Sequence, residues 1–387
     1  MAEHYWFSGD AAWLKHNADK LLKACQWITH ERNRTKEFDP ASLRGIERGL
    51  IPPGSLEDIG DWRCWMSNNG FSWWGMDSVA KALADIKHPQ AAALQAEADA
   101  FKKDFLAAFT EAMVRAPVVR LRDGRYIPQI PSEVHRRGRT YGWITTTLEG
   151  SIYLIRTGAI EPTDPMALCI LEDYEDNLYL SEQFGYPLKH MTNWFSRGGF
   201  SQQPNLLCSP LPYLARDEIK HFLRSYFNGF ISCYYPDTQM LCEHPLPDLG
   251  DFRGDHYKSS DESNSAYWLR LMFIDERKND LYLGMALPRD WLADGLSPEI
   301  QRAATRFGPM SLRFESHAAQ RNITAFIDPP TRRVPGQVFL RFRHPEQKRL
   351  ARVEMDGHPL TSFDAAKELI QLPALRGSTK VVAWFAE

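Results

Sequence analysis

The sequence predicts a mainly α-helical protein that ends in a smaller β domain. Three observations carry this prediction. From residue 9 onward, apolar residues recur at three- and four-residue steps, which is the period of amphipathic helices. The helical stretches come in pairs with a long loop after each pair, in cycles of roughly 60 residues. After Leu281 the pattern changes to short alternating segments separated by Pro, Gly and Asp, as in an antiparallel β-sandwich.

The predicted helices follow one another as hairpins. They cover residues 9–36, 72–86, 90–115, 141–156, 164–178, 199–215, 217–230 and 261–275. A helical hairpin cannot bury its apolar face alone, so neighbouring hairpins are expected to share one core. The strands follow in segments such as SLRFESHA, QVFLRFRHP and TKVVAWFAE. We therefore expect a helical domain over residues 1–280 and a β-sandwich domain over residues 281–387.

The composition narrows the range of partners. The 387 residues carry 46 Lys and Arg against 49 Asp and Glu, and a net charge of −3 gives no basic surface for nucleic acid or for an anionic membrane. The 12 tryptophans point instead to stacking surfaces for apolar or sugar faces. No CxxC or HExxH motif is present, so neither a metal nor a cofactor is expected. There is no export signal or membrane span in the chain, which predicts a cytoplasmic location.

Several segments carry a family resemblance. They are the run HYWFSGDAAWLKHNADKLLKACQWI, the segment GLIPPG followed by GDW, and WWGMDSVAKALAD. With the terminal sandwich, they resemble the six-hairpin glycosidase superfamily, whose enzymes are built on an (α/α)6 toroid. The resemblance implies a glycoside hydrolase, with inversion preferred. Because about eight helices are visible where six hairpins are needed, we expect a partial toroid, completed by an upstream segment or by a second chain.

Inverting hydrolysis of a glycoside needs two carboxyl groups about 6.5 to 9.5 Å apart, one as acid and one as base. The first acidic cluster is SLEDIGDW, in which Asp61 or its neighbour Glu57 is the predicted catalytic carboxylate. Trp62 and Trp65 could stack on a sugar and raise the pKa of a nearby carboxyl. The alternative is a loop in which an Asp caps a turn beside a core tryptophan.

The second acidic cluster is EHPLPDLGDFRGDHYKSSDESN, directly before the last predicted helix. By analogy with the superfamily, Glu262 is the predicted second carboxylate and His256 a sugar contact. Capping of the helix N-terminus explains the SDE triplet equally well. A polysaccharide lyase or sugar epimerase on the same toroid would instead move protons with His256 and Tyr257. A non-catalytic carbohydrate-binding fragment is the remaining alternative.

A third segment, NWFSRGGFSQQPN, is predicted to recognise sugar hydroxyls. It places Trp194, Arg197 and Gln203 together, and amide or guanidinium groups beside a ring suit groups that both donate and accept hydrogen bonds. Its two glycines could instead serve close helix packing. Glu149, within an apolar helix, is either salt-bridged or functional. The Arg-rich segment 128–140, PQIPSEVHRRGRT, could bind a uronate carboxylate or could be a solvated loop.

Overall fold

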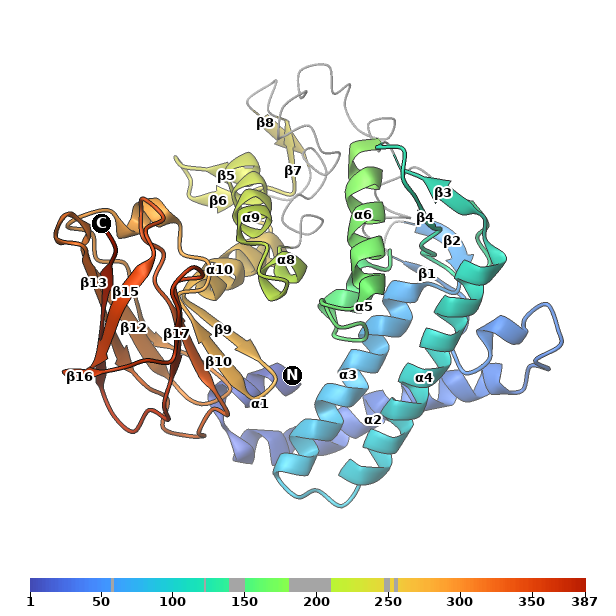
Figure 1. Ribbon diagram of the computed structural model, residues 1–387. Coiled ribbons are helices and arrows are strands. Elements are labelled where there is room, and N and C mark those ends of the chain that lie inside the picture. Colours follow the sequence, from blue (N-terminus) through green and yellow to red (C-terminus); the bar gives the residue numbers. More distant parts are fainter. Residues whose placement is uncertain (57–58, 122, 139–149, 181–209, 247–250, 254–256) are drawn as a thin grey trace.

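The computed structural model describes residues 1–56, 59–121, 123–138, 150–180, 210–246, 251–253 and 257–387. In these ranges the α-helices lie between Ala2 and Phe273, and the two large sheets begin at Ile274 (Figure 1). The predicted fold class, paired helices followed by a β-sandwich, is thereby confirmed.

The helical part starts with α1 and α2, which meet at a sharp turn. Gly9 ends α1 in a left-handed conformation with a φ of 72°, which glycine adopts without a steric penalty. The Asp10 side chain then accepts a hydrogen bond from the Trp13 amide at 2.8 Å and so caps α2. The described helices are α1 (Ala2–Ser8), α2 (Ala11–Lys36), α3 (Met66–Asp85), α4 (Ala91–Arg115), α5 (Ile152–Arg156), α6 (Pro165–Leu180), α8 (Leu211–Ala215), α9 (Ile219–Cys233) and α10 (Ser259–Phe273).

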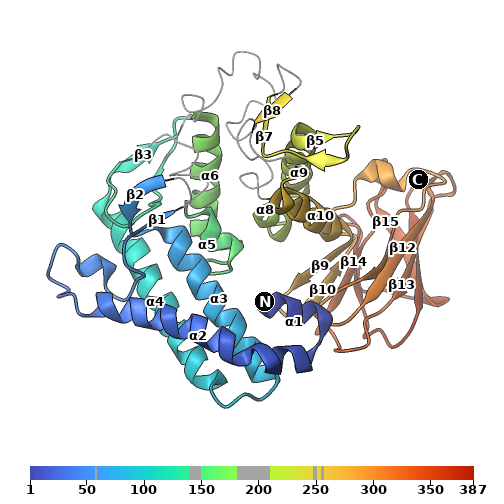
Figure 2. The ribbon, with the colours of Figure 1, turned by 180° about the vertical axis from the view of Figure 1, so that it is seen from behind.

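The helices pack against one another in chain order. α2 and α4 both contact α3, and α5 contacts α3 on another side. A Cβ on Gly70 would lie 3.1 Å from the Leu154 side chain, so the absence of a side chain there lets α3 and α5 approach closely. From α6 the series continues to α8, where the Tyr213 hydroxyl donates to Glu175 at 2.5 Å. Figures 1 and 2 show α3 to α6 on one side of the molecule and α8 to α10 on the other.

The strands of the sandwich form two sheets. One has five strands in the order β17-β18-β14-β10-β9, and the other has six in the order β11-β12-β13-β19-β15-β16. Their bounds are β9 (Ile274–Arg277), β10 (Asp280–Leu283), β11 (Glu299–Ala303), β12 (Met310–His317), β13 (Asn322–Asp328), β14 (Val338–Arg341), β15 (Leu350–Met355), β16 (His358–Pro359), β17 (Phe363–Asp364), β18 (Leu369–Leu372) and β19 (Thr379–Phe385). The short 3-10 helix η7 (Arg289–Leu292) follows β10, and η8 (Ala318–Gln320) connects β12 to β13.

The sandwich differs from the prediction in one strand pair. β10 and β14 run parallel, with Leu281 opposite Val338, whereas a purely antiparallel sandwich was expected. The reason is that the chain leaves the five-stranded sheet after β10, builds β11 to β13 of the other sheet, and returns. A crossover of this kind brings two strands together in the same direction. The predicted domain division at residues 280 and 281 stays a prediction, and the sheet itself already begins with β9.

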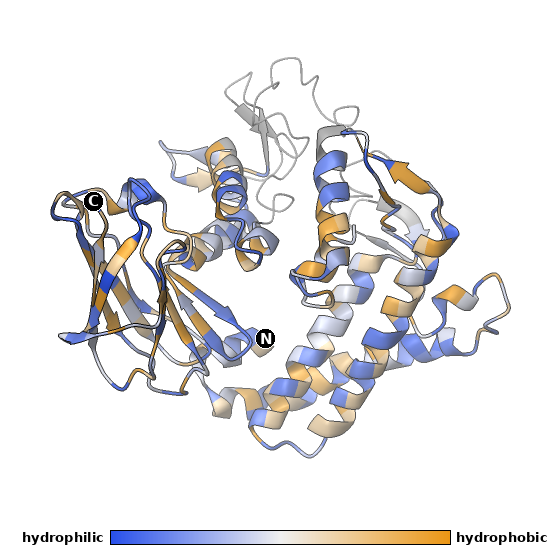
Figure 3. Cartoon of the chain, viewed as in Figure 1, coloured by the Kyte–Doolittle hydropathy of each residue, from blue (hydrophilic) through white to orange (hydrophobic). Residues whose placement is uncertain are grey.

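The core runs through both parts of the chain. One buried apolar cluster includes residues of each described helix and the inward positions of the sandwich strands. Along β12 the buried positions alternate with partly exposed ones, as expected for a strand with one face in a core. The same alternation is visible as changing colours along the strands in Figure 3.

Candidate active site at the loop end of the helical array

Four short hairpins lie at one end of the helical array. They are β1–β2 (Gly54–Leu56 and Ile59–Arg63), β3–β4 (Val118–Arg120 and Tyr126–Pro128), β5–β6 (Tyr234–Tyr235 and Met240–Leu241) and β7–β8 (His244–Leu246 and Asp251–Arg253). Figure 1 shows all four at the upper end of the helices. The described parts of the two acidic clusters, residues 55–62 and 243–264, thus lie at the same end. The third predicted segment, residues 193–205, lies outside the described residues.

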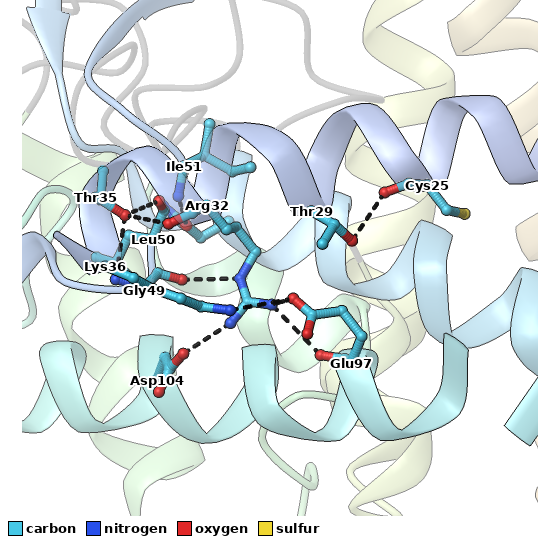
Figure 4. A network of polar contacts seen from close by, with 11 residues as sticks. Cys25, Thr29, Arg32, Thr35, Lys36, Gly49, Leu50, Ile51, Glu97 and Asp104 are labelled. Carbon is cyan, nitrogen blue, oxygen red and sulfur yellow. Dashed lines mark hydrogen bonds and ion pairs between the residues drawn. The ribbon is translucent and has the colours of Figure 1, made fainter. Parts of the chain in front are cut away.

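An arginine network holds the chain that leads into β1–β2 (Figure 4). Arg32 on α2 is fully buried and donates to the Gly49 carbonyl at 2.8 Å and to the Asp104 carboxylate at 2.7 Å. It also pairs with Glu97 of α4. The Thr35 hydroxyl donates to the Leu50 carbonyl at 2.7 Å. These contacts fix the segment that ends at the hairpin onto two long helices.

The tryptophans of the first cluster have different environments. Trp62 on β2 is 75% exposed, so its ring is available to a ligand. Trp65 is 1% exposed, and its indole N–H donates to the Gly54 carbonyl at 3.0 Å. Its ring is enclosed, which corrects the predicted stacking role of Trp65: the residue anchors β1. Asp61 lies on β2, and Glu57 lies outside the described residues.

Buried carboxylates lie beneath this hairpin. Glu133 is 1% exposed and accepts from the His135 amide at 2.8 Å, while Arg63 lies 3.7 Å from its other oxygen. The His135 ring contacts the buried Glu47 carboxylate at 2.6 Å. Arg137 donates to the Val134 carbonyl at 2.9 Å. Such internal pairing favours a structural role for the described part of the 128–140 segment over uronate binding.

The second cluster lies at the N-terminus of α10. Lys258 is the N-cap residue, and no side chain caps the helix. Asp261 and Glu262 lie in its first turn, where negative charge is favourable, so capping in the strict sense does not explain the triplet. Glu262 is half-buried, and its carboxylate makes no hydrogen bond or ion pair with any residue that the structure describes.

Asp261 was not selected from the sequence, yet it has the more unusual environment. It is 1% exposed, and Oδ1 has no hydrogen-bond partner among the described residues. Burial is the main cause that raises the pKa of this carboxyl from 3.8 to about 6; the Ser260 hydroxyl and Lys258 act to lower it, and Glu243 acts to raise it. Lys258 and Glu243 themselves form an ion pair of 2.7 Å. A carboxyl that keeps its proton up to about pH 6 can act as a general acid in mildly acidic solution.

A polar contact joins this helix to the opposite side of the array. Arg156 on α5 donates to the Asn264 side chain at 3.2 Å. Asn264 follows Glu262 on α10, so this helix turn faces α5. The predicted residues Trp194, Arg197, Gln203, His256 and Glu149 lie outside the described residues. Tyr257, the described half of the proposed lyase pair, is 58% exposed.

The described ranges contain no cluster of His, Cys, Asp and Glu that could hold a metal ion. Their five cysteines are free thiols, namely Cys25, Cys64, Cys169, Cys233 and Cys242. No helix in the described part of the chain is both long and apolar enough to cross a membrane.

Comparison with known proteins supports the fold. Neither a protein-family model nor a curated protein sequence matches the chain. Among solved structures, it is similar to the α-L-rhamnosidase of Dictyoglumus thermophilum, with a TM-score of 0.52 and 10% identity over 99% of this chain. The chain spans 38% of that protein's length. The helical hairpins and the terminal sandwich thus form a six-hairpin glycosidase-like fold.

Two further glycoside hydrolase structures align less well. A protein described as a glycoside hydrolase gives a TM-score of 0.38 at 9% identity, over 99% of this chain and 75% of its own. A β-arabinofuranosidase of family GH127 gives a TM-score of 0.27 at 10% identity. That alignment covers 82% of this chain and 59% of the arabinofuranosidase chain. At these scores the two alignments add nothing to the assignment of the fold.

Proposed function

We propose that this chain belongs to a glycoside hydrolase and carries its two catalytic carboxylates. The observation that carries the proposal is the pair Asp261 and Glu262 in the first turn of α10, at the same end of the array as the β1–β2 hairpin. One carboxyl of the pair is buried with a raised pKa, and the other is accessible. The six-hairpin glycosidase-like fold supports this choice of enzyme class over other carboxylate chemistry.

In the proposed mechanism Glu262 acts across the site from Asp61 or its neighbour Glu57. One of them protonates the leaving oxygen, and the other activates a water on the opposite face of the sugar ring. Inversion requires a separation of about 6.5 to 9.5 Å between the two carboxyl groups. Asp261, directly beside Glu262, is a second candidate for the acid because its raised pKa keeps it protonated in mildly acidic solution.

The sugar is proposed to stack on Trp62, the exposed ring of the hairpin. Trp194, Arg197, Gln203 and His256 are proposed to contact its hydroxyl groups. The hydroxyl contacts would orient the ring so that the scissile bond lies between the two carboxylates.

The experiment that tests the proposal is a hydrolysis screen on the full chain. Nitrophenyl glycosides of common pyranoses and furanoses would be offered, beginning with the α-L-rhamnoside. The anomer of the first product, followed by NMR, would show inversion or retention. In parallel assays, an unsaturated product from an oligouronate would identify a lyase, and epimerisation of a free sugar would identify an epimerase. Sugar binding without turnover would leave only the carbohydrate-binding alternative.

A further inference from the structure

A group of arginines lies where the sandwich meets the helical part, far from the α10 cluster in the sequence. The chain that continues β14 carries Arg341 and Arg343 on one side. Phe342 and His344 point to the other side, into the sandwich. There the ring centroids of Phe342 and Phe314 lie 5.7 Å apart, and those of His344 and Phe385 lie 4.5 Å apart. Because side chains alternate along an extended chain, Arg341 and Arg343 share the side that faces away from the sandwich core.

Two of the nearby guanidinium groups are neutralised by carboxylates. Arg341 forms two hydrogen bonds with Asp217, at 2.5 and 3.0 Å. Arg289 forms two with Glu368, at 2.6 and 3.1 Å. Each pair uses both oxygens of one carboxylate, which is the strongest arrangement for these groups.

Arg343 is the third guanidinium, and no carboxylate remains for it. It is 9% exposed, yet it makes no hydrogen bond or ion pair with any residue that the structure describes. Its Nε is wholly buried without an acceptor, and so is the Nε of Arg341. Of the acids that act on Arg343, Glu368 and Asp217 are both engaged already. The group as a whole therefore holds one positive charge in excess.

An unpaired buried charge is unfavourable. The pKa of Arg343 is lowered to about 10, mainly by burial and also by the neighbouring charges of Arg289 and Arg341. The His344 ring cannot supply a negative charge, because an imidazole is either neutral or cationic. A bound anion would balance the charge of Arg343.

We propose that Arg343 binds one small inorganic oxyanion, of the phosphate or sulfate type. A guanidinium offers parallel N–H donors that match the oxygens of such an anion. One unpaired guanidinium beside two carboxylate-paired ones needs a single compensating charge, which a small anion supplies. The anion would join β14 to η7 and, through Arg341 and Asp217, to the turn before α9. This proposal does not depend on the proposed glycosidase function.

The test is calorimetric titration of the full chain with sodium phosphate and with sodium sulfate, with chloride at equal ionic strength as the reference. We expect saturable binding at a single site for both oxyanions and none for chloride. Arg343→Met keeps the apolar stem and removes the charge, and should lose the binding completely. Arg376→Met, at an exposed arginine between β18 and β19, is the matched control and should bind as the wild type does.

Thermal unfolding separates specific binding from general salting effects. Phosphate and sulfate stabilise most proteins because they are excluded from the protein surface. This general effect should raise the unfolding midpoint equally in the wild type and in both variants. We expect an additional, saturable rise of the midpoint in the wild type and in Arg376→Met alone. In chloride, Arg343→Met should be more stable than the wild type because an unpaired charge is gone. The proposal would be overturned if phosphate raised the unfolding midpoint equally in all three proteins. It would also be overturned if the wild type showed no heat of binding, and this second test does not require Arg343→Met to fold.

Discussion

Asp261 and Glu262 are adjacent in the sequence but have different surroundings in the fold. Successive helix residues are turned by about 100°, so only one of the two can share the inward face of α10. Asp261 shares that face with Ser265 and Trp268, four and seven positions further on, and all three are buried. Glu262 lies at the edge of this face and keeps contact with solvent. Burial therefore raises the pKa of one carboxyl, while the other stays accessible to solvent.

Replacing Glu262 by Gln is expected to reduce turnover by about three orders of magnitude or more, since the amide can neither give nor take the proton. The free energy of unfolding should hardly change, because the side chain makes no hydrogen bond or ion pair with another described residue that would be lost. Rates with the best glycoside from the screen, together with urea unfolding, would measure both. Glu299→Gln, on an exposed position of β11, is the control and should keep full turnover. If Asp261→Asn lost turnover and Glu262→Gln kept it, the two roles would have to be exchanged.

Asp261 is also expected to make stability depend on pH. Its pKa is about 6 in the folded chain and 3.8 ordinarily, so ionisation is less favourable in the folded state. Below about pH 4 the carboxyl is protonated in both the folded and the unfolded state. As the pH rises from there through about 6, its contribution to the free energy of unfolding falls by at most about 3 kcal/mol. Asp261→Asn removes this pH-dependent loss of stability. The variant should therefore match the wild type in acid and exceed it at neutral pH, by urea unfolding at several pH values. A difference that does not change with pH would contradict the burial of an ionisable carboxyl at this position.

At the level of elements, the Arg32 network determines where the β1–β2 hairpin starts. Arg32→Met should lower the free energy of unfolding by about 3 kcal/mol, because it leaves the Glu97 and Asp104 carboxylates without their buried partner. Amide exchange at Gly49 and Leu50 should become faster, since Arg32 holds the Gly49 carbonyl. Urea unfolding and hydrogen exchange would measure the two effects. Arg34→Met is the matched control on the same helix: Arg34 is 61% exposed, so loss of its pair with Glu31 should change stability by less than about 0.5 kcal/mol.

The elements that could be predicted from the sequence are those with a clear period. The pattern around Leu14, Leu21 and Cys25 gave α2 within two residues of its observed start, because a helix of this length repeats its buried face many times. The alternation in SLRFESHA likewise gave β12. The parallel pairing of β10 with β14 could not be predicted, since it depends on which sheet the chain enters after Gly284.

The site was less predictable than the fold. Composition placed Trp62 and Trp65 in one aromatic cluster, but only the fold shows that one ring is exposed and the other enclosed. The choice between Asp261 and Glu262 could have been made from spacing, because Ser265 and Trp268 continue the face of Asp261. Arg343 gave no signal in the sequence. Its significance depends on Asp217 and Glu368 being used by other arginines, which is a property of tertiary contacts.

At the level of the whole molecule, the helical part and the sandwich are joined by chain continuity and by polar contacts. α10 passes directly into β9, whose partner β10 lies within the five-stranded sheet. Arg277 on β9 donates to the Leu214 carbonyl of α8 at 3.0 Å. Arg332 and Arg333, in the chain between β13 and β14, contact the Phe7 carbonyl and the Asp85 carboxylate. One apolar core includes both parts.

We therefore expect the chain to unfold as one cooperative unit despite its two kinds of architecture. Pulsed hydrogen exchange with mass spectrometry, at increasing urea, would follow peptides of α3 and α4 beside peptides of β12 and β13. All should lose protection at the same midpoint, because opening either part exposes the apolar surface that both share. Arg32→Met provides the sharper test. Its change lies in the helical part, yet it should lower the midpoint of the β12 and β13 peptides as much as that of α3 and α4, whereas independent units would leave the sandwich unchanged.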